Sequence, residues 1–451
     1  MKPGYVTSSG DQVFFSGKDV HREKKVWGEE QWIVNKEYCG KKLILKKNHR
    51  CSMHHHQTKD EVFYLQSGKV LLELGKEKRT LVAGDFVHVP TGTPHRFTGL
   101  EDSEIFEFST THDEADSYRS ELSGHIDQVR FERQSGLIKN FRSVSVLVIG
   151  DVMLDTYVEG VVERVSPEAP IPVVHHRLSR SVPGGAANAA MNVAALGGKV
   201  TLLGLVGDDD QAKRLEALLS DGGVRSSIVT DSSIRTIEKV RVVSGGQQMI
   251  RVDYEDVRPL SSAQRQSFLK KVKTMLPKHD ALLLSDYAKG MFSSELLKDC
   301  IGAAKKAGVP VILDPKPRDG DYVKSIKGAS VITPNRGESL MLAGASSSVQ
   351  PSAIGKMLRK KTGSDVLLTL GAHGMMLVSG AKAQIHEFPA LAKEVADVSG
   401  AGDTVAATVA LTLAAGGTLT DGADLSNRAA SVVVSKQGTA TLTGEELLRV
   451  L

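Results

Sequence analysis

The feature that most constrains this fold is a change in the spacing of apolar residues near residue 140. Before about residue 120, short alternating runs such as 61–65 are separated by turns that contain glycine. Short strands at even spacing predict an all-β sandwich or small barrel. From residue 144 onward, apolar strands such as 146–149 alternate with helical patterns such as 186–196, which is typical of a parallel sheet flanked by helices. We therefore expect a domain at 1–120, a partly helical linker at 121–142 and a second domain at 143–451.

Length and composition agree with two globular domains. The chain has 451 residues, 41% of them hydrophobic and 24% charged, which is long for a single core and typical of globular proteins. Its formal net charge is only +4, so we expect no nucleic-acid partner. No apolar stretch reaches membrane-spanning length, and three scattered cysteines argue against a disulfide framework. We expect a cytoplasmic protein without a membrane partner.

The strongest chemical signal is the run in which Asp403 follows Gly400-Ala401-Gly402. A small apolar stretch, 405–415, comes next, so the run is predicted to open a helix with its free amides facing outward. Such amides form an anion site. Asp403 beside them can accept a proton from an attacking hydroxyl while the amides stabilise a transferred phosphoryl group. An ordinary glycine-rich helix start with an acid in its first turn would explain the same residues.

Three further patches fit phosphoryl transfer, and each also has a purely structural explanation. Residues 367–374 predict a buried strand that runs into a glycine turn, where backbone can approach nucleotide phosphates, but any hairpin shares this pattern. Asn335 and Glu338 follow a strand and offer oxygen ligands for magnesium, or else form a capped helix start. In 183–188, glycines open a helix whose Asn188 can bind a sugar hydroxyl or simply cap the helix.

Together, in this order, the patches resemble the ribokinase-like (PfkB) family of carbohydrate kinases over residues 144–451. Within it the chain resembles the heptose 7-phosphate kinases through the strings Gly150-Asp151-Val152-Met153-Leu154-Asp155, Ser166-Pro167-Glu168-Ala169-Pro170, Met249-Ile250-Arg251-Val252-Asp253, Ser285-Asp286-Tyr287-Ala288-Lys289-Gly290 and Asp314-Pro315-Lys316. The resemblance implies a ribokinase-like α/β fold, with a mostly parallel sheet flanked by helices and a small β lid. It also implies that ATP and Mg²⁺ serve to phosphorylate the anomeric hydroxyl of D-glycero-β-D-manno-heptose 7-phosphate, giving a 1,7-bisphosphate on the route to ADP-heptose. We expect a homodimer.

The resemblance assigns roles residue by residue. Asp403 would be the base, beside an anion hole formed by Gly400, Ala401 and Gly402. Magnesium and phosphate would be served by Asn335 and Glu338. The nucleotide contacts would be Thr369, Gly371, Ala372, Gly374 and Asn427. The sugar would be held by Asp155, Gly184, Gly185 and Asn188. Asp397 matches a position that supports a monovalent cation in some relatives.

The substrate's distal phosphate needs cations, and the heptose-kinase strings offer Arg251, Lys289 and Lys316, each of which could equally lie on a solvated face. Two departures from that branch matter. Pro317 stands where the branch usually has glycine, which would alter the loop near the sugar phosphate. The chain ends soon after Gly438-Thr439-Ala440, without the nucleotidyltransferase domain often fused to such kinases, so we expect another protein to activate the sugar.

The first domain carries histidines at regular positions. On a strand, residues two apart share a face, so His54 and His56 are predicted to point into the barrel. Glu61 and His95 complete a nitrogen and oxygen set suited to zinc, iron, manganese or nickel. A histidine run on the surface is the alternative. The spacing of these four residues resembles that of a cupin, and the other positions of that pattern are Gly68, Gly84, Pro90 and Gly92, with Asn48 in place of the first glycine and Gly99 in place of the final asparagine.

The strings around these histidines, 53–56 and 106–110, look like those of sugar-isomerase and sugar-phosphate cupins. In that case a metal would polarise the carbonyl and hydroxyl of an open-chain sugar while a nearby base moves a proton. One expectation is a bifunctional enzyme, whose cupin isomerises a ketose phosphate such as sedoheptulose 7-phosphate before the kinase acts. The other is a single kinase, for this or another sugar, with a non-catalytic cupin that binds sugar or mediates oligomerisation. Cupin folds host many activities, so the fold cannot decide between them.

Overall fold

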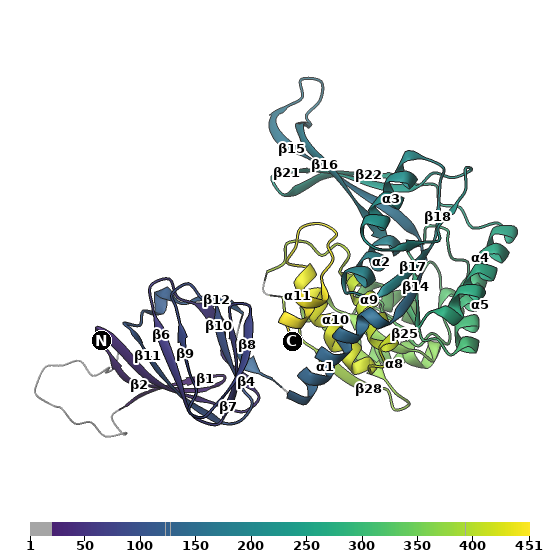
Figure 1. Cartoon of the computed structure of the whole chain (residues 1–451). Coiled ribbons are helices and arrows are strands. Elements are labelled where there is room, and N and C mark those ends of the chain that lie inside the picture. The colour runs from purple at the N-terminus through teal and green to yellow at the C-terminus, as the bar shows by residue number, and fades with distance from the viewer. Residues whose placement is uncertain (1–19, 122, 127, 393) are drawn as a thin grey trace, which may run out of the picture. The chain divides into compact units, whose positions relative to one another are not determined.

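The structure is a computed structural model that describes residues 20–121, 123–126, 128–392 and 394–451 (Figure 1). Residues 1–19, predicted to belong to the first domain, lie outside this part of the chain. The chain divides into two compact units, Met1–Arg133 and Gln134–Leu451. Within the described ranges, none of the helices combines the length and apolar character needed to span a membrane.

The first unit consists of two antiparallel sheets that enclose an apolar core (Figure 1). One sheet has the order β1 (His21–Lys25), β2 (Gly28–Asn35), β3 (Tyr38–Leu45), β11 (Ser103–Thr110), β6 (Glu61–Ser67), β9 (Phe86–Val89). The other has the order β12 (Tyr118–Glu121), β5 (Met53–His55), β10 (His95–Gly99), β4 (His49–Arg50), β13 (Gly124–His125). In addition, β10 pairs with β7 (Lys69–Leu74), which pairs with β8 (Glu77–Val82). The predicted all-β barrel is confirmed, and its core is built from alternating strand residues such as Leu65 and Ile105.

The segment predicted as a linker, 121–142, is divided between the two units. Strand β13 pairs with β4 of the barrel. Helix α1 (Gln128–Asn140) follows, and Gln134 in its middle is buried and donates to Asp424 Oδ2 at 2.8 Å. Ile138 is buried as well. The second half of α1 is therefore packed into the second unit, because it covers apolar and polar surface there.

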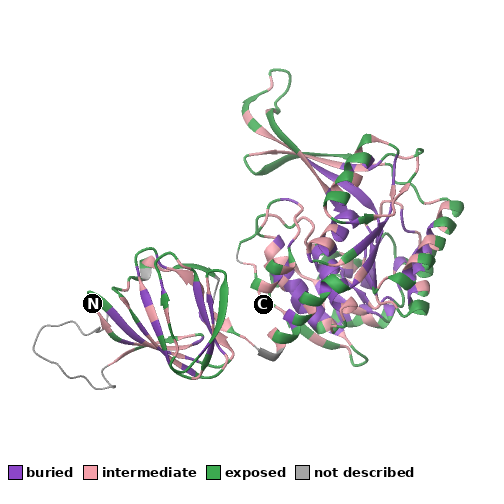
Figure 2. Ribbon diagram, viewed as in Figure 1, coloured by how far each residue is buried: buried purple, intermediate pink, exposed green. Residues whose placement is uncertain are grey.

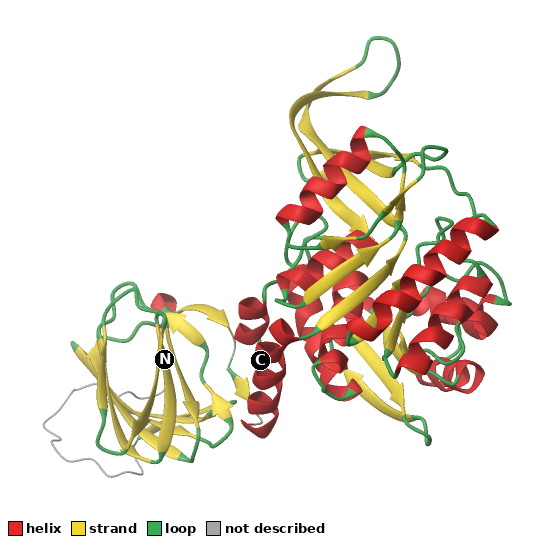
Figure 3. Cartoon of the chain, turned by 45° about the vertical axis from the view of Figure 1, so that its right-hand side comes forward, coloured by secondary structure: helices red, strands yellow, loops and turns green. Residues whose placement is uncertain are grey.

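The second unit is built on a large sheet with helices on both faces (Figure 3). Its strand order is β19 (Arg225–Ser226), β17 (Lys199–Leu203), β14 (Ser145–Gly150), β23 (Ala281–Ser285), β24 (Val311–Asp314), β25 (Val331–Ile332), β26 (Asp365–Thr369), β27 (Met375–Ser379), β28 (Gln384–Phe388). Pairing is parallel as far as β26 and antiparallel beyond it. This confirms the predicted ribokinase-like sheet.

Each face of this sheet has its own helices. One face packs against α4 (Ser262–Met275), α5 (Ser294–Ala307), α7 (Arg336–Ala343) and α8 (Pro351–Thr362). The other packs against α2 (Ala186–Ala195), α9 (Ala401–Ala414) and α10 (Leu419–Val433). The unit also contains α3 (Asp210–Asp221), α6 (Tyr322–Ser325), α11 (Gly444–Arg449), β18 (Leu205–Val206) and β20 (Val229–Thr230).

A separate sheet forms the predicted lid. Its order is β16 (Pro172–Gly185), β15 (Val152–Val165), β21 (Ile237–Ser244), β22 (Gln247–Tyr254). Strand β15 begins in the buried body of the unit and extends away from it, β16 returns and ends there, and Figure 2 shows the outer part of both strands mostly exposed. The lid therefore begins at the carboxyl end of β14, an interior strand of the large sheet, from which the chain continues into β15.

Candidate active site and candidate metal centre

The N-terminus of α9 lies at the centre of the second unit's candidate site. Gly400 precedes the helix with φ of 79°, a left-handed conformation that favours glycine. A Cβ atom at this position would lie 2.6 Å from Asn188 Nδ2, so a larger residue would also collide with α2. The amides of the first turn have no acceptor within the helix. The structure thus places Gly400, Ala401 and Gly402 where an anion could bind.

Asp403, in the first turn of α9, is 2% exposed and accepts two hydrogen bonds. Asn188 Nδ2 donates to Oδ2 at 2.7 Å, and the Tyr287 hydroxyl donates to Oδ1 at 2.9 Å. Burial raises the pKa of Asp403 to about 7, the two hydrogen bonds limit the rise, and the negative charge of Asp155 adds to it. A carboxylate with such a pKa can exchange protons near neutral pH.

Helix α2 brings the predicted sugar contacts to the same place. Its N-terminal neighbour Gly185 has φ of 58°, and a Cβ there would lie 2.5 Å from the carbonyl oxygen of Asp151. Asn188 follows in the first turn, and Asn192 one turn later accepts from Thr404 Oγ1 at 2.8 Å. The starts of α2 and α9 are therefore held together by side-chain hydrogen bonds.

Asp155 on β15 pairs with Val182 on β16, the strand that leads into α2, and its negative charge contributes to the raised pKa of Asp403. A Cβ at Gly184 would lie 2.4 Å from Asp155 Oδ2, so glycine is required for the close approach. Arg241 Nη1 on β21 donates to Asp155 Oδ1 at 2.6 Å. Sequence reasoning missed Arg241, because no motif marks a residue whose partner lies 86 positions away.

The predicted nucleotide contacts fall at one end of the sheet, around the segment that follows β28. Thr369 ends β26, and the turn after it contains Gly374 with φ of 83°. A Cβ at Gly374 would lie 2.0 Å from the carbonyl oxygen of Phe388. Asn427 Nδ2 on α10 donates to the carbonyl oxygen of Pro389 at 2.9 Å. Gly371 and Ala372 lie in the short 3₁₀ turn between Thr369 and Gly374.

Asn335 and Glu338, predicted for magnesium and phosphate, form a capping box at the start of α7. Asn335 Oδ1 accepts from Glu338 N at 2.9 Å, and Glu338 Oε2 accepts from Asn335 N at 3.0 Å. Lys316 Nζ donates to the other carboxylate oxygen of Glu338 at 2.9 Å. Asn335 also pairs with Thr369 across a parallel bridge, so these residues adjoin the predicted nucleotide contacts.

Asp314, at the end of β24, belongs to one of the heptose-kinase strings, but the resemblance assigns it no role. Burial and the nearby negative charges of Asp403 and Glu338 raise the pKa of Asp314 well above its usual range. Its carboxylate also faces the first turn of α9, since a Cβ at Gly402 would lie 3.9 Å from Asp314 Oδ2. Acidic side chains thus converge between the predicted base and the predicted magnesium position.

The three side chains predicted to bind the distal phosphate lie in two separate places, two of them at the base of the lid and one near the start of α7. Arg251 on the exposed strand β22 pairs with Asp253 at 2.7 Å, and Lys289 pairs with Glu255 at 2.7 Å. Lys239 contacts both of these carboxylates, at 2.9 Å and 3.3 Å, and so joins the two pairs at the base of the lid. Lys316 instead lies with Glu338, near the start of α7.

Asp397, the predicted position for a monovalent cation, bridges two loops. Its Oδ1 accepts from Ser399 N at 2.8 Å, and its Oδ2 accepts from Gly438 N at 3.1 Å. The carboxylate therefore ties the loop before α9 to the loop after α10.

In the first unit, the structure brings the four predicted metal ligands together. His54 and His95 are directly paired on β5 and β10, and their ring centroids are 4.5 Å apart. The His56 ring lies 5.1 Å from that of His54. Glu61, at the start of β6, reaches His95 Nε2 at 3.2 Å and His56 Nε2 at 3.7 Å.

Each of the three imidazoles is oriented by a backbone carbonyl. The Nδ1 atoms of His54, His56 and His95 lie 2.9, 2.8 and 3.1 Å from the carbonyl oxygens of Ser52, Asp116 and Thr93. Such contacts hold a proton on Nδ1 and leave Nε2 as the free ligand atom, the arrangement common around protein-bound metals. Burial, followed by the neighbouring His95, lowers the pKa of His54 to about 4, and burial also lowers the pKa of His56.

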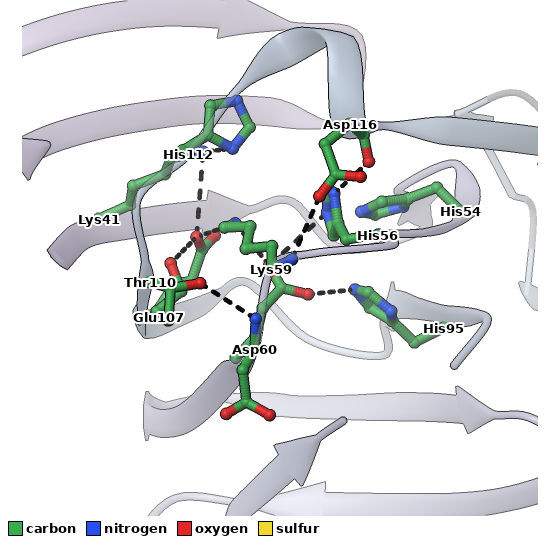
Figure 4. A network of polar contacts seen from close by, with 12 residues as sticks. Lys41, His54, His56, Lys59, Asp60, His95, Glu107, Thr110, His112 and Asp116 are labelled. Atoms are coloured by element: carbon green, nitrogen blue, oxygen red, sulfur yellow. Dashed lines mark hydrogen bonds and ion pairs between the residues drawn. The ribbon is translucent and has the colours of Figure 1, made fainter. Parts of the chain in front are cut away.

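A buried lysine occupies the centre of this cluster (Figure 4). Lys59 Nζ lies 2.5 Å from Glu61 Oε1 and 2.5 Å from Glu107 Oε1, and Lys41 Nζ lies 3.9 Å from Glu107. Burial by itself would raise the pKa of Glu61, but contacts with His95 and Lys59 outweigh it and hold this pKa well below its usual range. Lys59 thus supplies a positive charge beside the predicted metal ligands.

Sequence reasoning missed both Lys59 and Glu107, although alternation offered a signal. Lys59 is two residues before Glu61, and Glu107 shares an inward face of β11 with Ile105. A period of two would have placed both in the barrel interior.

The donor set fits a divalent transition metal, although Lys59 already contacts one of its members, Glu61. His95 Nε2 is buried and faces the Glu61 carboxylate at 3.2 Å without forming a well-aligned hydrogen bond, so this atom is directed at the other predicted ligands. In the part of the chain described, however, no three His, Cys, Asp or Glu side chains stand as a ready metal cage. Glu61 is engaged by Lys59, so binding a metal would require that contact to loosen. The cluster lines a cavity of about 170 Å³ that Lys25, Arg119 and Trp27 also border.

The two departures from the cupin pattern touch each other. Asn48 has φ of 61°, which asparagine tolerates better than most residues. The backbone N–H of Asn48 donates to the carbonyl oxygen of Gly99 at 2.8 Å. A Cβ at Gly99 would lie 2.5 Å from the carbonyl oxygen of Lys46. Glycine at 99 and asparagine at 48 therefore preserve the turn and its close packing.

Comparisons with known proteins agree with both units. The family model described as pfkB family carbohydrate kinase matches residues 144–445, and that of the cupin domain matches residues 42–109. The chain is 45% identical over 316 residues to the bifunctional protein HldE of Caulobacter vibrioides, and 43% identical over 324 residues to that of Gluconobacter oxydans. These matches cover 69% and 70% of this chain but only 64% and 66% of the relatives.

Solved structures show the same fold at low identity. The Escherichia coli phosphofructokinase-2 complexed with potassium is 21% identical, with a TM-score of 0.57 over 68% of this chain and 97% of that one. The Arabidopsis thaliana ribokinase complexed with ribose and ATP is 22% identical, with a TM-score of 0.53 over 68% of this chain and 98% of that one. At such identities the likeness speaks for the fold alone.

Proposed function

Because this chain belongs to the pfkB family of carbohydrate kinases, we propose that it transfers the γ-phosphoryl group of ATP to the anomeric hydroxyl of a heptose 7-phosphate. The product would be the 1,7-bisphosphate. The observation that carries the proposal is the buried carboxylate of Asp403 at the N-terminus of α9, hydrogen-bonded to Asn188 in the predicted sugar site.

Asp403 suits the role of the base, because a pKa of about 7 lets it take a proton near neutral pH. The sugar oxygen would lose its proton to Asp403 as it bonds to the γ-phosphorus, while the bond from phosphorus to ADP breaks. The first-turn amides of α9 would bind the oxygens of the transferred group. Asp155, fixed by Arg241, would orient a second sugar hydroxyl.

Magnesium bound with ATP neutralises charge on the phosphates. The residues present fit it, because Asp314 lies near Asp403 and Glu338, and burial together with the negative charges of these two groups raises the pKa of Asp314 well above its usual range. A divalent cation held by oxygen ligands would relieve that repulsion. Asp314 would offer a carboxylate ligand. In contrast, Asn335 and Glu338 cap each other across the start of α7 and Glu338 also pairs with Lys316, so a cation bound there would displace those contacts.

The heptose 7-phosphate is supported by the family strings and by the charged chain at the base of the lid. Lys289, Lys239 and Arg251 are joined there through two carboxylates, and a phosphate could replace a carboxylate as their partner. The chain spans only about two thirds of the HldE relatives that it matches, so the substrate stays a proposal.

Substrate profiling tests this choice. The full chain is assayed for ADP release with ATP, magnesium and a heptose 7-phosphate, a hexose 6-phosphate or ribose. We expect kcat/KM for the heptose 7-phosphate to exceed the others by about two orders of magnitude. Lys289→Ala should erode this preference, whereas Lys270→Ala, at an exposed position of α4, should not. A higher kcat/KM for an unphosphorylated sugar would overturn the substrate assignment.

For the cupin unit, the proposal is a metal site formed by His54, His56, Glu61 and His95. A bound metal would polarise the carbonyl and hydroxyl of an open-chain sugar phosphate. Beside these ligands, the buried ion pair of Lys59 and Glu107 would supply a fixed positive charge to the oxygens of the sugar. The alternative, a non-catalytic sugar-binding cupin, is favoured by the contact between Lys59 and Glu61, which leaves no ready metal cage among the described residues.

An experiment on a kinase-inactive variant of the full chain distinguishes the catalytic metal site from the non-catalytic cupin. Asp403→Asn protein is incubated with sedoheptulose 7-phosphate, its metal content is measured by mass spectrometry, and ketose–aldose exchange is followed by NMR. His95→Ala should abolish both metal binding and exchange, while His88→Ala, whose side chain is 55% exposed, should leave them intact. If metal binds and no ketose phosphate is ever converted, the non-catalytic alternative holds.

The proposed homodimer would form through the lid. All eight residues of the edge strand β22 are exposed, including Met249, Ile250, Val252 and Tyr254. Exposed apolar side chains on a free strand edge favour pairing with a second copy. Ile250→Lys should give monomers in light scattering, and Val257→Lys, outside the strand, should not. A monomeric unmodified chain would contradict the proposal.

A further inference from the structure

The loop between β23 and α5 delivers one side chain to the predicted base. Tyr287 is the second residue of this loop, and its hydroxyl donates to Asp403 Oδ1 at 2.9 Å. Its backbone amide donates to Asp151 Oδ2 at 2.8 Å. The kinase residues assigned from the family strings do not include Tyr287, so its contact with Asp403 is unexplained by them.

The loop is held unusually firmly by buried carboxylates. Asp151 accepts from the amides of Tyr287, Lys289 and Met291, at 2.8, 3.1 and 3.0 Å. Asp286 Oδ1 accepts from the amide of Ala288 at 2.8 Å, and Ala288 itself has φ of 57°. A residue held at positive φ by surrounding hydrogen bonds indicates a backbone whose shape is imposed by its setting. The backbone from which the Tyr287 side chain reaches Asp403 is therefore held by hydrogen bonds within the unit.

The two oxygens of Asp403 have different partners. Oδ1 accepts from the Tyr287 hydroxyl, which comes from the loop, and Oδ2 accepts from Asn188, which belongs to the predicted sugar site. A sugar hydroxyl that replaces or joins Asn188 would meet Oδ2. Oδ1 is already occupied and lies on the other side of the carboxylate.

From this asymmetry we propose that Tyr287 is a positioning residue for phosphoryl transfer, which locks Asp403 through Oδ1 so that Oδ2 receives the proton of the attacking sugar hydroxyl. The inference rests on the proposed role of Asp403 as base. The proton moves from the sugar oxygen to Oδ2, that oxygen bonds to the γ-phosphorus, and the phosphorus–oxygen bond to ADP breaks. Tyr287 keeps its own proton throughout, and burial together with the charge of Asp403 raises the pKa of its phenol well above its usual range.

The same hydrogen bond tunes the base. Donation from Tyr287 favours the charged carboxylate and so lowers the pKa of Asp403, against burial and the negative charge of Asp155, which raise it. The other charged groups that face this carboxylate are Asp314 on β24 and Arg241, which acts through Asp155. Removal of the phenol hydroxyl should therefore move the onset of activity to higher pH.

The test is Tyr287→Phe in the full chain, assayed across pH on whichever sugar gives the highest turnover. We expect kcat to fall about tenfold or more with KM little changed, and the acid limb of kcat/KM to move up by about one pH unit, a tenfold change. The matched control is Tyr322→Phe. Tyr322, which is buried while Tyr287 is half-buried, donates its phenol proton to Asp286 Oδ2 at 2.7 Å in the same region, and no hydrogen bond joins it to Asp403.

Two outcomes overturn the proposal: an unshifted acid limb in Tyr287→Phe, or the same shift in Tyr322→Phe. If Tyr287→Phe does not fold, 3,5-difluorotyrosine at position 287, a stronger donor, should move the acid limb to lower pH instead, and no movement would count against the role. Substantial turnover by Asp403→Asn would instead show that Asp403 is not the base. The failure of the inference is thus distinguishable from failure of the proposed function.

Discussion

Asp403 in the kinase unit and Glu61 in the cupin unit are both 2% exposed, yet their surroundings shift the pKa values of the two carboxyl groups in opposite directions. Asp403 accepts from an amide and a phenol, which are neutral, and burial raises its pKa to about 7. Glu61 faces the ammonium of Lys59 and the imidazole of His95, and its pKa is held well below the usual range despite burial.

The contrast separates two uses of a buried acid. A carboxylate among neutral donors is poised to gain a proton and return it, which suits a base. A carboxylate beside a buried cation keeps its charge, which suits a ligand or a counter-ion. Depth of burial is the same in both units, so the charge of the neighbours decides the chemistry.

The largest expected effect comes from Asp403→Asn, which removes the proton acceptor and keeps the shape. Turnover should fall by about 10²- to 10⁴-fold, measured as ADP release, with the melting temperature little changed. The matched control is Asp210→Asn, another first-turn aspartate, whose side chain is 87% exposed. A loss of less than tenfold in Asp403→Asn would end the comparison, because Asp403 would then be a structural cap.

Lys59→Met tests the other half of the comparison. It leaves Glu61 and Glu107 buried without their shared cation, which should destabilise the barrel by about 3–5 kcal/mol, read from the unfolding of the full chain in urea. A divalent metal should restore part of this stability by supplying the missing charge. Lys42→Met breaks the partly exposed pair with Glu104 and should cost less than about 1 kcal/mol. Equal stabilities of the two variants would show that the buried cation is dispensable.

The pH profile of the kinase sharpens the contrast. Protonated Asp403 cannot accept the sugar proton, so kcat/KM should fall about tenfold for each pH unit below the pKa of about 7 and level off above it. The sign follows from the raised pKa, because the active form is the charged one that predominates at higher pH. An acid limb centred near the ordinary pKa of an aspartate would show that burial does not govern this group.

The smallest expected effect concerns Asn48, where backbone conformation and not charge contributes to the stability of the barrel. Asn48 has φ of 61°, and alanine tolerates that region poorly. Asn48→Ala should therefore destabilise the barrel by about 1 kcal/mol, while Asn48→Gly should be nearly neutral in urea unfolding. A loss in the glycine variant as large as in the alanine variant would point to the asparagine side chain instead.

Much of both sites followed from local patterns. The position of Asp403 was predicted because a glycine-rich helix start orients its first turn whatever the rest of the chain does. The shared face of His54 and His56 followed from the period of a strand. Both depend on backbone geometry over a few residues, as do the predicted barrel strands and the parallel sheet.

The sequence by itself therefore determined the two folds and the direction of the main candidate side chains. Only the tertiary structure decided which charges meet. Tyr287 and Asp403 are 116 positions apart, Lys59 and Glu107 are 48 apart, and Arg241 and Asp155 are 86 apart. Local geometry sets where a side chain points on its own element, but its pKa depends on neighbours that arrive when distant elements pack together.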